Sequence, residues 1–302
     1  MTDLFSRHHK ASDIPVWLST LILRAFSLLP LPILFVIGSC LGQLLFYLHA
    51  SRRRITLKNL QTCYPQKSQS EINSLTQKHF RYLAYALIST GIGWWGSKNR
   101  MRRITHIRNE HELNTLLDEG RNIIFLAPHF TGLEYGGIFL SSERLVVSMY
   151  QKNKNVLLDT LIKDHRSRFG AIQYSSKEPV RSMVRYIRDG LPFYYLPDQD
   201  PGRKGVFVPF FNISTATFPA LGRIAKMSKA TVIPCATYFL PWGKGIEIHF
   251  LPPLQNYPLG DDEADTSQMN QAIERLIELA PAQYLWSHKR FKTRPEGEPS
   301  FY

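Results

Sequence analysis

The sequence has few cysteines, and no group of side chains in it has the spacing of a metal site. Its three cysteines, Cys40, Cys63 and Cys235, lie far apart and fit neither a disulfide framework nor paired zinc ligands. It also has no internal repeat, no low-complexity tract, and no helix-turn-helix, zinc-finger or aromatic-rich RNA-binding motif. These absences favour a reducing compartment and argue against a disulfide-stapled secreted domain, a bound metal and a nucleic-acid partner.

Acidic residues are also scarce relative to basic ones. The 24 Asp and Glu residues face 37 Lys and Arg residues, which gives a formal net charge of +13. Such an excess draws a protein towards anionic surfaces, and anionic lipid, nucleic acid or an acidic protein could each supply one. Hydrophobic residues make up 44% of the 302 residues, enough for a buried core and too many for a disordered chain.

Formal charge is missing altogether between Arg24 and Arg52. The stretch from Ala25 to Leu48 is mostly Leu, Ile, Phe and Val, and it exceeds the roughly 20 apolar residues that a spanning helix needs. We therefore expect residues 1–50 to form a membrane anchor, although Pro30 leaves open a hairpin or an interfacial segment. The three arginines that begin at Arg52 favour the cytoplasmic side of an inner membrane, where anionic headgroups lie.

The remaining residues, 51–302, alternate between strand-like and helix-like patterns. Short apolar runs at 122–127, 193–196 and 231–234 are separated by segments with helical periodicity. Such interleaving predicts a single α/β domain with a mixed, largely parallel sheet flanked by helices. The chain is therefore predicted to have two parts, an N-terminal hydrophobic anchor helix and one α/β domain.

The most informative segment is the apolar run 123–127, which ends at Pro128 and is followed by His129 and Glu134. In open α/β sheets, ligands bind beyond the carboxyl ends of the strands. Five residues of ideal helix rotate by about 140°, so the His129 and Glu134 side chains can meet only if His129 lies in the turn. An N-cap at Thr131 would place it there. Alternatively, Thr131 and Glu134 form a capping box and the histidine is structural.

The His129-x4-Glu134 spacing resembles the first motif of the glycerolipid and lipid A acyltransferase superfamily, in which a His-x4-Asp or His-x4-Glu pair follows a strand. Longer stretches are similar to the lipid A late acyltransferases, the lauroyl and myristoyl transferases. Together with the N-terminal hydrophobic anchor, they place the resemblance over the chain from about residue 52 to its end. The stretches are residues 150–159, 197–211, 232–234 and 280–295.

This resemblance implies an acyltransferase of lipid A, and therefore lipopolysaccharide, biosynthesis. Its donor would be a fatty acyl thioester on acyl carrier protein, and its acceptor a hydroxyl of a Kdo-bearing lipid A precursor in the inner membrane. The catalytic domain would lie on the cytoplasmic side. Acyl carrier protein, the lipid A precursor and inner membrane lipids would be its partners, and we expect no cofactor besides the acyl-carrier co-substrate.

The chemistry of acyl transfer assigns a role to each residue of the motif. A neutral imidazole on His129 would take the proton of the acceptor hydroxyl. Glu134 would accept a hydrogen bond from the other ring nitrogen and so fix its tautomer. Arg166, or backbone amides beside His129, would face the negative charge that develops on the thioester oxygen.

Several further residues are predicted to bind substrate. The resembled family has Arg-Pro after the residue at Tyr150, where this chain has Gln151-Lys152, so a point charge replaces a guanidinium. The acidic pair after Pro197 would shape the site or cap the turn that follows, and we favour the turn. The cations would bind phosphates and carboxylates, or serve only solubility. The candidates are Lys152, Arg168, Asp198, Asp200, Arg203, Lys204, Arg290, Lys292 and Arg294.

Two alternatives stay open at this point. The same His-x4-Glu chemistry would serve another lipid acceptor, such as a lysophospholipid or an ornithine lipid. The positive charge, with a pI of about 9.7, also fits a non-catalytic module that binds anionic membranes.

Overall fold

The N-terminal apolar stretch forms two helices. The computed structural model describes residues 11–175 and 178–302, so the first ten residues of the predicted anchor lie outside the described part. Helix α2 (Ile14–Phe26) follows a short 3-10 turn, η1 (Ala11–Asp13), and α3 (Leu31–Leu48) begins after Pro30. Proline fixes its own φ and offers no backbone donor, so the break falls there. Among the described helices, α3 alone is long and apolar enough to cross a membrane.

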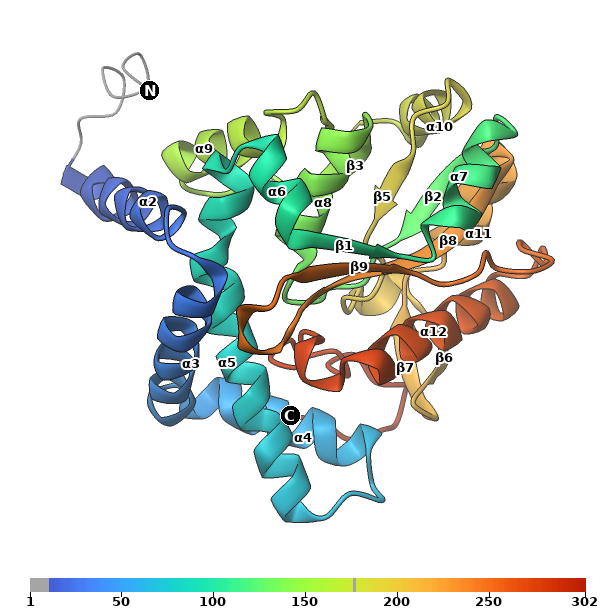
Figure 1. The fold of residues 1–302 in the computed structure, drawn as a ribbon. Coiled ribbons are helices and arrows are strands. Elements are labelled where there is room, and N and C mark those ends of the chain that lie inside the picture. The colour runs from blue at the N-terminus through green and yellow to red at the C-terminus, as the bar shows by residue number, and fades with distance from the viewer. Residues whose placement is uncertain (1–10, 176–177) are drawn as a thin grey trace.

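Helix α5 (Gln69–Trp95) links these N-terminal helices to the rest of the molecule. It begins at a capping box, in which Ser68 and Glu71 satisfy each other's backbone N–H groups. Helix α3 packs closely on α5, because a Cβ added at Gly38 would lie 2.6 Å from the Tyr85 Cα atom. Helix α4 (Ala50–Cys63) connects α3 to α5 across one end of the molecule (Figure 1).

A seven-stranded sheet forms the centre of the domain, in the order β1-β9-β8-β2-β5-β3-β4. All neighbouring strands are parallel except β8 and β9, so the prediction of a mixed, largely parallel sheet is confirmed. A separate hairpin is formed by β6 (Val206–Phe210) and β7 (Ile213–Thr217). The sheet strands are β1 (Thr105–Arg108), β2 (Asn122–Leu126), β3 (Val147–Tyr150), β4 (Ile172–Ser175), β5 (Phe193–Tyr195), β8 (Ala230–Phe239) and β9 (Ile246–Phe250).

Helices cover both faces of the sheet and give it two apolar cores. On one face, buried residues of α4, α10, α11 and α12 pack against the strands. On the other face, residues of α3, α5, α6, α7 and α8 do so (Figure 1). The remaining bounds are α6 (Lys98–Ile104), α7 (Glu110–Asp118), α8 (Leu133–Glu143), α9 (Val156–Arg166), α10 (Val180–Arg188), α11 (Ala220–Ser228) and α12 (Asp262–Leu279), with 3-10 turns η2 (Gly202–Lys204), η3 (Pro241–Gly243) and η4 (Pro281–Gln283).

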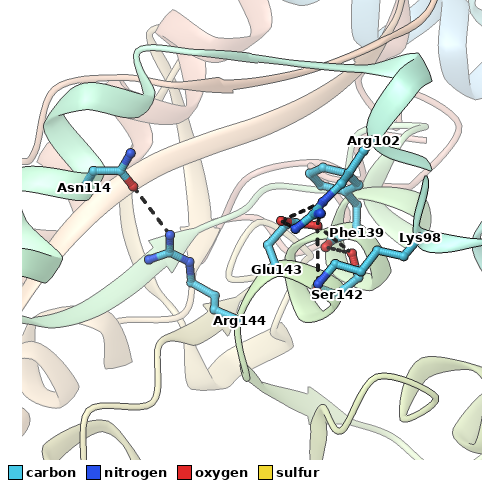
Figure 2. A network of polar contacts seen from close by, with 7 residues as sticks. All are labelled: Lys98, Arg102, Asn114, Phe139, Ser142, Glu143 and Arg144. Atoms are coloured by element: carbon cyan, nitrogen blue, oxygen red, sulfur yellow. Dashed lines mark hydrogen bonds and ion pairs between the residues drawn. The ribbon is translucent and has the colours of Figure 1, made fainter. Parts of the chain in front are cut away.

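The end of α8 is fastened by polar contacts (Figure 2). Arg102 of α6 donates to both carboxylate oxygens of Glu143, with Nε at 3.0 Å from Oε1 and Nη2 at 2.8 Å from Oε2. Lys98, also on α6, donates to the backbone carbonyl of Ser142. Helix α8 is therefore held at its carboxyl end, and its first turn projects into the candidate site from a fixed scaffold.

The parallel strands bring four loops to the same edge. Strands β2, β5, β3 and β4 are neighbours and run in one direction, so the segments that follow them meet at one edge of the sheet. His129 follows β2 at this edge and Asp198 follows β5. Ligands of open α/β sheets bind beyond the carboxyl ends of the strands, so the candidate site is expected at this edge.

Candidate active site

His129 lies in the turn between β2 and α8, as the sequence predicts. Ala127 still belongs to the sheet, because its N–H donates to the Tyr195 carbonyl at 2.8 Å. Helix α8 then begins at Leu133 with Gly132 at the N-cap. The predicted N-cap at Thr131 is therefore wrong, and so is the capping box, because the Thr131 hydroxyl contacts the Gln283 side chain instead.

A buried carboxylate holds His129 at two points. The Asp198 Oδ1 atom lies 2.7 Å from the imidazole Nδ1, and Oδ2 accepts the His129 backbone N–H at 2.9 Å. The Asp198 side chain is 2% exposed, and the His129 side chain is 20% exposed. The clamp fixes the ring and leaves Nε2 as the nitrogen on the side away from the carboxylate.

The environment of this pair shifts both pKa values towards the charged forms. Burial lowers the pKa of His129, but the charge and hydrogen bond of Asp198 outweigh burial, so the pKa lies above its ordinary value of 6.5. Burial likewise raises the pKa of Asp198, and the charge and hydrogen bonds of His129 reverse the shift, so the pKa falls below its ordinary value. Asp198 is therefore an ionised partner whose charge favours an imidazolium.

Glu134 has a different partner from the one predicted. Its carboxylate accepts bonds from Arg166, with Nε 3.1 Å from Oε1 and Nη2 2.6 Å from Oε2, and from the Trp94 indole at 3.3 Å. In the described part of the chain none of its hydrogen bonds goes to His129, so the predicted contact between Glu134 and the imidazole is corrected. Glu134 is 25% exposed and Arg166 35%, which places this pair nearer to solvent than the clamp.

The register of the strands explains why Asp198, and not Glu134, contacts His129. Leu126 of β2 and Tyr195 of β5 are register partners on adjacent parallel strands. His129 lies three residues after Leu126, and Asp198 lies three residues after Tyr195. The two parallel strands therefore bring His129 and Asp198 together. The prediction that Asp198 mainly caps a turn is therefore wrong. The matching segments 127–129 (Ala-Pro-His) and 196–198 (Leu-Pro-Asp) carry a signal that could have identified the pair.

A small apolar cavity lies beside the Glu134–Arg166 pair. Its volume is about 60 Å³, and it extends between α8 and strands β3, β4 and β5. Mainly apolar side chains line it beyond the charged pair, and Gly137 and Ser141 form part of the α8 wall. The lining includes Leu133, Ile138, Val146, Met149, Tyr194 and Leu196.

Three of the predicted substrate-binding residues have structural partners instead. Asp200 accepts the Thr293 N–H at 2.7 Å and the Gly202 N–H at 2.8 Å, which confirms the turn-capping role that we favoured. Arg168 donates to the Gly93 and Gly96 carbonyls at the end of α5. Arg290 is buried and donates to the Ala216 carbonyl and the Thr217 hydroxyl, so burial keeps it from an external ligand.

The other predicted cations fall into two groups. Arg294 donates to the Ser214 carbonyl and pairs with Glu298, so its guanidinium is largely committed. The exposed side chains are Lys152, Arg203, Lys204 and Lys292. These four can meet a large anionic partner. Among residues 11–175 and 178–302, no group of three or more His, Cys, Asp or Glu side chains has an arrangement that could hold a metal ion.

Sequence comparisons relate this chain to a known family. The pattern that defines the bacterial lipid A biosynthesis acyltransferases matches residues 4–293. A lipid A biosynthesis lauroyltransferase of Escherichia coli (strain K12) is 33% identical over 288 residues, which cover 95% of this chain and 94% of the relative. A lipid A biosynthesis acyltransferase of Haemophilus influenzae (strain ATCC 51907 / DSM 11121 / KW20 / Rd) is 34% identical, covering 95% and 93%. A lipid A biosynthesis myristoyltransferase of E. coli K12 is 27% identical, covering 93% and 88%.

These matches span nearly the whole chain, including the segments that carry His129 and Asp198, so the molecule is an acyltransferase. The chain belongs to the bacterial lipid A biosynthesis acyltransferase family.

Proposed function

We propose that this enzyme transfers a fatty acyl chain from acyl carrier protein to a hydroxyl of a Kdo-bearing lipid A precursor, with His129 as the general base. The observation that carries the proposal is the clamp of a 20%-exposed imidazole by a buried aspartate at the carboxyl edge of the sheet. Membership of the family supports acyl transfer in lipid A biosynthesis. The donor, the acceptor and the roles of the residues are our proposals.

His129 would remove the acceptor proton through Nε2. As the hydroxyl oxygen attacks the thioester carbon, the C–O bond forms and the proton passes to the imidazole. Asp198 would stabilise the resulting imidazolium, because it is buried, ionised and bonded to Nδ1. When the C–S bond breaks, the imidazolium would return the proton to the departing thiolate, which leaves as the thiol of the carrier. Protons balance without a further cofactor.

Arg166 would stabilise the oxygen that becomes negative in the tetrahedral intermediate. Its bonds to Glu134 use Nε and Nη2, so Nη1 is the nitrogen of the fork that this pair does not use. Its charge also acts on His129, whose pKa it lowers, so the two groups share one electrostatic environment. In this proposal Glu134 orients Arg166, and a fixed donor is worth more than a mobile one because it needs no reorganisation during the reaction.

The cavity beside Glu134 and Arg166 would receive the acyl chain of the donor. Its lining is mainly apolar, and it starts at the charged pair that would face the thioester carbonyl. Its volume of about 60 Å³ holds only part of a long chain in this structure. Side chains at its α8 wall, such as Ser141, would therefore set how far the chain enters.

The exposed cations would meet the charged parts of the two substrates. Lys152 follows β3, and Arg203 and Lys204 lie in η2 after β5, so all three follow the carboxyl ends of sheet strands, at what we call the catalytic edge. Carrier proteins are acidic and the lipid acceptor bears phosphates, so both are attracted by these charges. The catalytic edge would then face the cytoplasmic leaflet of the inner membrane.

The direct test is an assay of purified variants with a panel of acyl-carrier thioesters and the Kdo-bearing lipid, read by mass spectrometry. For His129→Ala we expect kcat/KM to fall by on the order of 10² to 10⁴, the contribution of a positioned base. Circular dichroism and thermal unfolding would confirm that the variant folds. A loss below tenfold in the folded variant would remove His129 as the base. Acylation of a lysophospholipid or an ornithine lipid in the same panel, without acylation of the Kdo-bearing lipid, would overturn the acceptor.

A further inference from the structure

Helix α3 is fastened to the folded domain along its length. At its start, the Leu31 backbone meets the η3 turn, where a Cβ added at Gly243 would lie 2.5 Å from the Leu31 carbonyl carbon. At its middle, Gly38 lies against the Tyr85 backbone of α5, and one turn later Gly42 lies against the same helix. The 18 residues of α3 span about 27 Å, and contacts with the domain extend along most of that length.

Both ends of α3 are also tied to the domain by arginines. Before its first turn, Arg100 of α6 donates to the carbonyls of Ser27 and Leu29. At its last turn, Arg53 of α4 donates to the Phe46 carbonyl at 2.7 Å. Helix α4 is in turn bonded to the C-terminal segment, through Asn59 and the carbonyls of residues 286 and 288. Both ends of α3 are therefore hydrogen-bonded to the folded domain.

The opposite side of α3 is an apolar stripe with no covering element among the described residues. Its exposed positions follow helical spacing, while Leu34, Gly38 and Phe46 on the other side are buried. Helix α2 and the turn between α2 and α3 add exposed apolar side chains of their own. We call this surface the α2–α3 face; its members are Ile14, Leu18, Leu21, Ile22, Leu28, Ile33, Val36, Leu44, Tyr47 and Leu48.

We infer that α3 does not cross the bilayer, and that the α2–α3 face lies in one leaflet with both ends of α3 on the same side of the membrane. This rests on the proposal that the enzyme works at a bilayer surface. A crossing α3 would draw its flanking elements into hydrocarbon, including exposed Lys244 after η3 and exposed Arg81 of α5. Charged side chains and loop backbone are both costly there. In the interfacial position only the apolar stripe is immersed.

Residues around the α2–α3 face fit the headgroup region of an anionic leaflet. Trp242 is exposed in the η3 turn and packs on Phe35 of α3 with ring centroids 5.5 Å apart, and tryptophan favours the membrane interface. Arg24, near the end of α2, and Arg54, in α4, are exposed cations that flank the two ends of α3 in the sequence. Anionic phospholipid headgroups complement these charges.

The same arrangement brings the leaflet next to the candidate site. Helix α2 lines an apolar groove of about 200 Å³ together with Leu158 of α9 and Trp94 of α5. The Trp94 indole donates to Glu134, so the groove lies one side chain away from the Glu134–Arg166 pair. A lipid whose chains stay in the leaflet could therefore present a hydroxyl to the catalytic edge without leaving the membrane.

The test is cysteine labelling, for which the three native cysteines are well placed. Cys40 is exposed on α3, whereas Cys63 and Cys235 are buried, so a Cys40→Ser background suits surface labelling. Leu28→Cys and Leu48→Cys place single thiols at exposed positions near the two ends of α3. Inverted and right-side-out inner-membrane vesicles are treated with a membrane-impermeant maleimide, and Gln271→Cys on α12 marks the side of the catalytic domain.

We expect both α3 thiols to react from the same side as the α12 thiol, and more slowly because lipid shields them. Reaction of Leu28→Cys and Leu48→Cys from opposite sides would overturn the inference while leaving membrane action intact. A bimane probe on native Cys40 should be quenched by lipids labelled at a shallow depth. An unquenched probe accompanied by cross-linked dimers would show that a second copy covers the face, and would also overturn it. A protein that fails to bind vesicles at all would instead contradict the proposed bilayer location.

Discussion

The two carboxylates of the candidate site differ in burial and in partner. Asp198 is 2% exposed and clamps the imidazole of His129, whereas Glu134 is 25% exposed and pairs with Arg166. The buried carboxylate can tune the charge of the base, and the more exposed one can orient a cation at the cavity. A His-x4-Glu spacing therefore identifies two residues of one site without making them partners.

The largest change that tests this comparison is Asp198→Asn. We expect kcat/KM to fall by on the order of 10² to 10⁴, because the ring loses the charge that fixes its tautomer and stabilises the imidazolium. The attraction of Asp198 raises the pKa of His129, so its removal lowers that pKa and moves the acid limb of the pH–rate profile to lower pH. The measurement is kcat/KM between about pH 5 and 9, in the range where histidine titrates.

Glu134→Gln is the matched control for this pH profile. It keeps the shape of the side chain and removes its charge, but it does not touch the ring of His129. We expect the acid limb to shift less than in Asp198→Asn. If Glu134→Gln moved the acid limb and Asp198→Asn did not, the partners would be reversed in the working enzyme and the comparison would fail.

The sequence predicts the position of His129 better than it predicts the partner of His129. The position of His129 depends on local signals, an apolar strand, Pro128 and the start of a helix, and these predict the turn correctly. The partner depends on strand order, because β2 and β5 are adjacent in the sheet although 66 residues of chain separate Leu126 from Phe193. Local periodicity carries no information on that adjacency, so Asp198 was predicted to cap a turn.

The same distinction applies to the fold. Alternating strand and helix patterns predict the α/β class and the largely parallel sheet, because each pattern is local. Whether a cation is buried depends on residues distant in the sequence. Arg290 looks like a surface charge in the sequence, yet it is buried and donates to the β7 backbone and to Thr217. Likewise the apolar N-terminal stretch reads as one anchor, and only the packing of α3 on α5 shows which of its sides is exposed.

Arg166→Lys tests the role of the more exposed pair, Glu134 and Arg166. Lysine keeps the charge but loses the planar fork whose Nε and Nη2 atoms contact both carboxylate oxygens of Glu134. If Arg166 stabilises the developing oxyanion, we expect kcat to fall by about 10²-fold with a smaller change in KM, as for loss of one oxyanion donor. Single-turnover assays would separate the chemical step from binding. A change confined to KM would assign Arg166 to substrate binding only.

A smaller effect is expected from Ser141→Leu, which adds bulk to the α8 wall of the cavity. The preferred acyl chain should become shorter, with a change in relative kcat/KM of roughly tenfold between chains that differ by a few methylenes. Mass spectrometry of products from mixed acyl-carrier thioesters measures this ratio directly. Thr115→Leu, at an exposed position of α7 outside the cavity lining, is the control and should leave the ratio unchanged.

The smallest effect is expected from Lys152→Ala. Lys152 is an exposed charge at the catalytic edge, and among residues 11–175 and 178–302 it makes none of the side-chain hydrogen bonds that hold Arg166 and Arg290. We expect KM for the acyl-carrier thioester to rise by about two- to fivefold at low salt, because a screened surface contact contributes little. The difference should vanish at about 0.5 M salt, where the Debye length becomes short. Lys226→Ala in α11, which ends beside the opposite edge of the sheet, provides the control, and an equal rise in its KM would mean that total charge rather than position attracts the carrier.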